Sequence, residues 1–192
     1  GANNYMTWEI ETDVVYKPWR FIGVGAGFFF TPPIDGNKTY SGEARDKNLR
    51  WQIEENRLMY LFAFRSGVYL YSPPVYLNHD HDVALSFRVS PGVTIPLPPN
   101  LSTSVDYVPK DAIIHVPATS GDVSNSHAKA CYYHVRFAMA LEVERVSVLL
   151  GYTTSDYDLY GGSRNMIVEG QKIELPRKKQ AGTFFIGLTY DF

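Results

Sequence analysis

Period-two alternation of apolar residues with small or polar ones runs through most of this chain and constrains the fold more than any other feature. Seven segments show it: 5–16, 21–30, 57–71, 83–97, 131–144, 146–157 and the closing 182–192. Strand side chains point to opposite faces in turn, so in 83–97 Phe87 and Arg88 take opposite faces. No segment of useful length has the helical period. The chain is therefore predicted to be all-β.

The less apolar face decides which side of the strands meets water. It carries mostly Gly, Ala and Ser with a few Arg and Glu, as in the alternating glycines of 21–30. A soluble strand would carry Lys, Glu, Thr and Gln there, whereas small residues suit the narrow interior of a barrel of about eight strands. The opposite face is large and aromatic. This pattern favours an antiparallel up-and-down transmembrane β-barrel, with Phe87 and Phe137 pointing toward lipid.

The closing stretch, GTFFIGLTYDF, ends on an exposed aromatic residue instead of a polar tail. Its in-phase residues are Phe184, Ile186, Leu188, Tyr190 and Phe192. With short turns on one side and long polar loops at 31–50, 98–128 and 158–179 on the other, the whole of 1–192 resembles the small outer-membrane β-barrel proteins of Gram-negative bacteria. The resemblance implies one barrel domain. It also implies that the barrel-assembly machinery reads the closing residues and that Phe192 lies at the periplasmic membrane interface.

The number of visible strands does not fit such a barrel, which normally has an even number with both ends on one side. Seven visible strands predict one of two things. Either a further strand precedes residue 1, or 51–77 divides into two strands at Arg65-Ser66-Gly67. We favour the first interpretation, because the alternation continues unbroken through Arg65.

Charged residues fall on the predicted inward face of several strands. They are Glu9, Glu11, Asp13, Arg65, Arg88, His134, Arg136 and Glu142. Buried charges need partners, so we expect a lumen network of salt bridges that plugs the barrel. Glu9 or Glu11 should pair with Arg88 or Arg136, because these positions reach similar depths. Selectivity or gating and, less favoured, catalysis are the alternative uses of these residues.

Motifs for catalysis, cofactors or metals are weak. The GVGAG stretch at 23–27 has no helix after it, so it does not predict a phosphate loop. His79 and His81 in NHDHD are weak candidates for binding a divalent metal, and a polar turn is the favoured interpretation. A net charge of -2 gives no indication of a nucleic-acid partner. We expect no cofactor.

Together these observations predict a non-enzymatic, integral outer-membrane barrel with a plugged polar lumen and long extracellular loops. Its expected surroundings are outer-membrane lipid and lipopolysaccharide, and its expected role is structural or in surface interactions. The second interpretation is a soluble β-barrel that binds lipid or a small ligand. The third is a membrane-embedded barrel enzyme, for which the sequence offers no convincing Ser, His and acid arrangement.

Overall fold

The chain is all-β in the computed structural model, as predicted. The structure describes residues 3–4, 8–31, 38–98, 101–111, 116–125, 128–176 and 178–191. Within these residues the regular elements are β-strands and one short 3-10 helix, η1 (Glu55–Leu58). No helix in the described part of the chain is long and apolar enough to cross a membrane.

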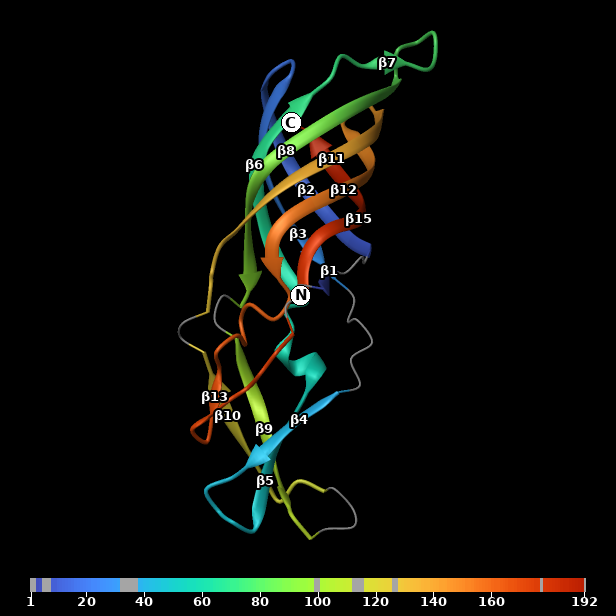
Figure 1. Ribbon diagram of the computed structural model, residues 1–192. Helices are drawn as coiled ribbons and strands as arrows, with labels where there is room; N and C mark the ends of the chain where they lie inside the picture. The colour runs from blue at the N-terminus through green and yellow to red at the C-terminus, as the bar shows by residue number, and fades with distance from the viewer. Residues whose placement is uncertain are drawn as a thin grey trace.

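Seven long strands form a closed barrel (Figure 1). They are β2 (Trp8–Trp19), β3 (Ile22–Phe30), β6 (Phe62–Tyr71), β8 (Val83–Leu97), β11 (Tyr132–Val143), β12 (Val146–Asp158) and β15 (Lys178–Asp191). Their order around the barrel is β15-β12-β11-β8-β6-β3-β2, and β15 pairs with β2 to close it. Consecutive barrel strands are therefore neighbours in space, as the up-and-down prediction requires.

The barrel closes through a parallel pair, so the prediction of an antiparallel barrel of about eight strands is confirmed only in part: the barrel has seven strands and mixed pairing. Strand β15 pairs with β2 in parallel over eight residues, from Phe184↔Trp8 to Asp191↔Val15, while the other six pairs are antiparallel. Seven alternating strands leave the first and last running the same way, which forces this result. The less favoured alternative, a division of 51–77 at Arg65-Ser66-Gly67, is wrong, because β6 continues through these residues. A short strand, β1 (Asn3–Asn4), also pairs with β15 in parallel.

At Gly27, strands β2 and β3 approach so closely that only glycine fits on the inner side of the barrel wall. A Cβ added to Gly27 would lie 2.1 Å from the backbone oxygen of Thr12 and 2.1 Å from Oδ1 of Asp13. Both distances are far below van der Waals contact, so any side chain would push β3 away from β2. Glycine at this inward position therefore gives the Asp13 carboxylate its space in the lumen.

Further strands lie in or directly beside the three segments predicted to be polar loops, 31–50, 98–128 and 158–179. These are β4 (Thr39–Glu43), β5 (Leu49–Glu54), β9 (Ser102–Pro109), β10 (Thr119–Ser124), β13 (Ile167–Val168) and β14 (Gln171–Lys172). The sheet order is β10-β9-β5-β4, and β13 pairs with β14 in a separate hairpin. We call this sheet, η1 and residues 157–176 the cap. Figure 1 shows it beyond the long-loop end of the barrel, opposite the end with the short turns and β7 (Val75–Tyr76).

The largest apolar core lies where the cap meets the barrel mouth. It joins cap residues such as Trp51, Ile53 and Val105 to Phe29 and Tyr132 from barrel strands. The cap is therefore packed onto the barrel through a shared core. In long loops the backbone N–H and C=O groups would lack partners within the protein. In the cap, pairing between strands gives these groups hydrogen bonds to each other.

Candidate functional site: the barrel lumen and its cap

Charged side chains fill the barrel interior. Glu9 is 0% exposed, Arg65 1% and Arg136 2%, although each is ionisable. Alternation along β2, β6 and β11 explains the burial, since the neighbours of these residues point outward. Ions removed from water are tolerated only when they have partners, so the geometry of the pairs decides whether this interior is stable.

The central pairs connect β2 with β6 and β11 across the lumen. Nη1 of Arg65 lies 2.9 Å from Oε2 of Glu9 and 3.1 Å from Oε2 of Glu11. Arg136 pairs with Glu11 and, at 3.1 Å, with Oδ2 of Asp13. The predicted contact of Glu9 or Glu11 with Arg88 or Arg136 is thus found for Glu11 and Arg136.

Arg88 forms its ion pair with a different carboxylate, that of Glu142. Its Nη2 is 3.1 Å from Oε1 of Glu142 and also contacts the hydroxyl of Ser147. Glu142 in turn accepts a hydrogen bond from Ser86. Glu142 is half-buried, whereas the other predicted lumen residues are buried. The polar lumen therefore contains two groups of ion pairs.

Tyr69, which was not predicted, and His134, which was, also belong to the polar interior. The hydroxyl of Tyr69 donates to Oδ2 of Asp13 at 3.0 Å, which gives Asp13 a partner besides Arg136. His134 is buried, and its Nδ1 lies 2.9 Å from Oγ1 of Thr94. This histidine is thus hydrogen-bonded to a neighbouring strand, and the partner of its Nδ1 is a hydroxyl group, not a carboxylate that could orient it as a catalytic base.

Each lumen arginine also covers an aromatic ring. The guanidinium carbon of Arg65 lies 3.7 Å from the ring centre of Phe29, that of Arg136 lies 4.3 Å from Phe185, and that of Arg88 lies 4.8 Å from Tyr71. Cation–π contacts of this kind are stronger when water is excluded. Sequence reasoning did not identify Phe29 or Tyr71 as lumen residues, although their strand phase places both on the inward face.

The barrel mouth is covered by residues 157–163, which are all buried. Gly161 and Gly162 lie against the side chains of Tyr132 and Tyr60. A Cβ added to Gly161 would lie 1.9 Å from the hydroxyl oxygen of Tyr132, and one added to Gly162 would lie 2.3 Å from Cζ of Tyr60. The side-chain amide of Asn125 donates to the carbonyl oxygens of Gly162 and Arg164, each at 2.9 Å. This mouth segment is therefore hydrogen-bonded and packed over the lumen.

Two tyrosines in and under the mouth segment have shifted acidity. Burial raises the pKa of Tyr60 to about 12. Burial, followed by the hydrogen bond that its hydroxyl donates to buried Glu55, raises the pKa of Tyr160. Both phenols therefore keep their protons well into alkaline solution, and neither is activated as a nucleophile or base at neutral pH.

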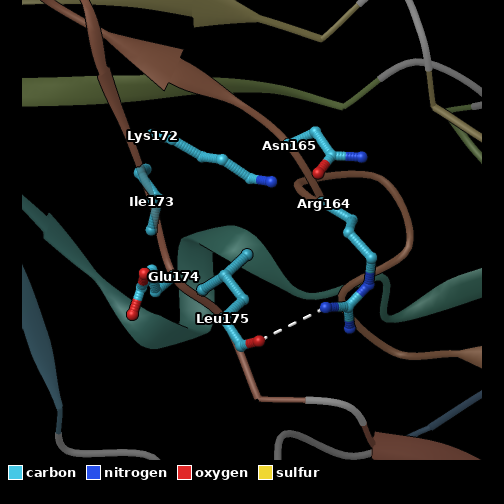
Figure 2. A pocket seen from close by; sticks show the side chains of 6 residues that line it. All are labelled: Arg164, Asn165, Lys172, Ile173, Glu174 and Leu175. Carbon is cyan, nitrogen blue, oxygen red and sulfur yellow. Dashed lines mark hydrogen bonds between the residues drawn. The ribbon is translucent and has the colours of Figure 1, made fainter.

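A cavity of about 350 Å³ lies beside the β13–β14 hairpin of the cap. Figure 2 shows its lining residues, Arg164, Asn165, Lys172, Ile173, Glu174 and Leu175. Nε of Arg164 donates to Asp158 at 2.8 Å, and its Nη atoms donate to the carbonyl oxygens of Leu175 at 3.2 Å and Pro176 at 3.0 Å. Arg164 therefore links Leu175 and Pro176 to Asp158 of the mouth segment, a role that sequence reasoning missed.

The weak metal candidates lie at the opposite end of the molecule. His79 and His81 are exposed in the turn between β7 and β8, and the ring of His81 packs 4.4 Å from that of Tyr76. Across the described residues, no group of three or more His, Cys, Asp or Glu side chains is placed to hold a metal ion.

The closing strand presents its apolar residues outward. Phe184, Ile186, Leu188 and Tyr190 are 41%, 50%, 54% and 37% exposed, while Phe185 between them is buried. Phe192 lies outside the described residues. Phe87 and Phe137 are 62% and 50% exposed, so both point away from the barrel axis as predicted.

Comparison with known proteins gives no match: no family model fits the chain, and no curated protein or solved structure is significantly similar to it. The resemblance to small outer-membrane barrels therefore stays a prediction. The functional conclusion depends on the fold and on the two faces of the barrel wall.

Proposed function

We propose that this protein is an integral barrel of a Gram-negative outer membrane, with a plugged polar lumen and a folded cap on the cell surface. The proposal depends on one observation: compared with a water-soluble barrel, the two faces of the wall are reversed, with ion pairs inside and exposed apolar side chains outside. A barrel in water would expose these apolar side chains at a high cost in free energy, at about 25 cal/mol per Å². Lipid removes that cost.

The height of the outward apolar surface supports the same proposal. On β11 the outward residues run from Tyr133 to Val143, with Phe137, Met139 and Leu141 between them. Ten residues along a strand at ~3.3 Å each give ~33 Å of contour. With a strand tilt of ~40°, the height is ~25 Å, the height of the lipid-facing band in membrane barrels.

The lumen favours a structural or surface-interaction role over transport. Three arginines paired with carboxylates and stacked on aromatic rings fill the interior, and the mouth segment covers it. The same filling argues against a soluble barrel that binds a lipid inside, because such a site is mostly apolar. Catalysis is the least supported alternative.

Fractionation of cells that express the native protein tests the proposal. We expect the protein in the outer-membrane fraction, extractable only with detergent and with a gel migration that changes on heating. Recovery of folded protein from the aqueous fraction without detergent would contradict the membrane proposal and favour the soluble interpretation. Strong single-channel conductance in a planar bilayer would contradict the plugged lumen.

The closing strand tests the proposed assembly pathway separately. If the barrel-assembly machinery reads the end of the chain, deletion of Phe192 should lower the outer-membrane yield in cells and leave refolding into detergent nearly normal. Full burial of one such side chain contributes only ~1.5–3 kcal/mol to a folded protein. An equal loss in both assays would mean that Phe192 contributes packing alone.

A further inference from the structure

The cavity beside the β13–β14 hairpin combines polar and aliphatic side chains in one lining. Its volume is about 350 Å³, and it is lined by Arg164, Asn165, Lys172, Ile173, Glu174 and Leu175 (Figure 2). Small-molecule sites typically measure ~300–1,000 Å³ and pair an apolar surface with a few polar groups. The cavity is therefore large enough for one small ligand, and its position in the cap places it outside the barrel wall.

Arg164 supports the shape of this cavity. The side-chain amide of Asn125 donates to the backbone carbonyl oxygen of Arg164 at 2.9 Å. The guanidinium group of Arg164 donates to Asp158 at 2.8 Å and to the carbonyl oxygen of Leu175 at 3.2 Å. Because Asp158 already balances its charge, Arg164 holds the lining in place and does not supply a free cation. A lining held in this way loses little conformational freedom when a ligand binds.

Asn165 has a backbone conformation that residues with side chains rarely adopt. Its φ is 65°, in the left-handed region. Asparagine enters this region more readily than most residues, and glycine does so without strain. Strained positions of this kind concentrate at binding and catalytic sites. The side chain of Asn165, an exposed residue that lines the cavity, is therefore a candidate to contact a ligand.

Lys172 and Glu174 add a donor and an acceptor to the lining. Both are exposed, whereas Ile173 between them is buried. Figure 2 shows the Lys172 side chain reaching toward Asn165, while the Glu174 carboxylate points in a different direction. An ammonium group has three N–H donors, an amide donates and accepts, and a carboxylate only accepts. Two groups with N–H donors are thus directed toward each other, and the charged acceptor is directed elsewhere.

We propose that this cavity binds a sugar acid, which is a monosaccharide that carries a carboxylate. The Lys172 ammonium and the Asn165 amide donate to the ligand's carboxylate, and charge-assisted hydrogen bonds of this kind are strong. The Glu174 carboxylate accepts from hydroxyl groups elsewhere on the sugar ring. An α-amino acid fits less well, because its ammonium group lies next to its own carboxylate, away from Glu174. This inference rests on the surface-interaction role proposed above and gives that role a ligand class.

Isothermal titration calorimetry of the full chain in detergent, with galacturonate as the probe, tests the site. The wild type should bind one galacturonate. Galactose, which lacks the carboxylate, and acetate, which lacks the sugar ring, should each bind at least tenfold more weakly. Galactose bound as tightly would overturn the carboxylate contact, and acetate or alanine bound as tightly would overturn the choice of a sugar. Absence of galacturonate binding would overturn the whole proposal.

Two variants and a matched control test the named contacts. Lys172→Met should weaken galacturonate binding at least fivefold, and Lys47→Met, at another exposed cap position, should leave it unchanged. Asn165→Gly removes the amide but suits a φ of 65°, so it should weaken binding at least threefold without lowering thermal stability. Equal binding by Lys172→Met and Lys47→Met, or unchanged binding by Asn165→Gly, would overturn the proposed contacts.

Insertion into vesicles, measured on the same preparation, separates this inference from the membrane proposal. Wild-type protein that inserts without binding galacturonate would overturn the sugar site alone. Failure to insert would contradict the proposed function, whatever the protein binds.

Discussion

The barrel and the cap use the same strand alternation with opposite polarity. In the barrel, Arg65 and Arg136 are buried while Phe137 is exposed. In the cap, Ile53 is buried, whereas its neighbours Gln52 and Glu54 are half-buried and exposed. Alternation alone therefore defines a two-faced strand. The environment on each side decides which face points inward.

This difference separates two ways of stabilising a β-structure. The cap buries apolar side chains away from water, which is the usual driving force of folding. The barrel interior depends on charge pairing, where loss of one partner leaves an uncompensated buried ion. Substitutions of similar size should therefore have different consequences in the two regions, and four predictions test this.

The largest effect is expected from removing a lumen cation. Arg65→Met removes the ion pairs that Arg65 makes with Glu9 and Glu11, and breaking such a buried pair costs ~3–5 kcal/mol. Chemical unfolding of the barrel refolded in lipid or detergent measures the loss. The double variant Glu9→Met with Arg65→Met should recover part of it. A single variant as stable as the wild type would show that the lumen does not depend on charge pairing.

A cavity in the cap core should come next. Ile53→Ala removes buried methylene groups from the shared core, and such changes cost ~2–5 kcal/mol. The matched change Ile186→Ala on the outward face of β15 should cost much less in a bilayer, because lipid tails are as apolar as the lost side chain. Hydrogen exchange should show faster exchange in β5 and β9 for the first variant. Equal losses at both positions would contradict the membrane environment of β15.

The third prediction compares an added arginine on the outer face of the barrel with one on the surface of the cap. Phe137→Arg should destabilise the inserted barrel by ~2–4 kcal/mol, since the arginine lies against hydrocarbon. Ser41→Arg, on an exposed position of cap strand β4, should change stability by no more than about 0.5 kcal/mol. Unfolding in lipid vesicles measures both. If Phe137→Arg were as harmless as Ser41→Arg, the outward face would be in contact with water.

The smallest effect is a pH dependence that arises in the core shared by the cap and the barrel. Burial raises the pKa of Tyr60 to about 12 from its ordinary value of 10.0. The folded protein keeps this proton where the unfolded chain has lost it. The stabilisation is therefore complete below about pH 10 and is lost as the pH rises toward about 12. Ultraviolet absorbance of tyrosinate, followed with cap unfolding, measures this. Tyr60→Phe should make the loss of stability with rising pH less steep. An unchanged dependence of stability on pH would contradict the raised pKa of Tyr60.

Sequence reasoning identified the barrel strands well because their alternation is long and uninterrupted. It missed the cap because the strands there are short and lie among polar residues. In β9, Thr103, Val105 and Tyr107 alternate with Ser104 and Asp106, so a periodic pattern was present. A run of this length in a Ser- and Pro-rich segment resembles a loop, and only pairing with β5 and β10 stabilises it.

The lumen residues were predictable as a set but not as pairs. Strand phase placed Glu11, Asp13 and Arg136 on the inward face. Their contacts depend on how far each strand is displaced along its neighbour. Arg136 and Asp13 are 123 residues apart in the chain and meet only after the barrel closes. The alternation within one strand carries no information on which residues of distant strands come into contact.

The sequence by itself determined which segments become barrel strands and which face of each is apolar, because a strand's side chains alternate whatever lies beside it. Tertiary structure alone decided the rest. It closed seven strands through the parallel pair of β15 and β2, folded the long loops into the cap, and paired Arg65 and Arg136 with the carboxylates of β2. These features depend on contacts between residues far apart in the chain, whose energies appear only when all the strands are in place.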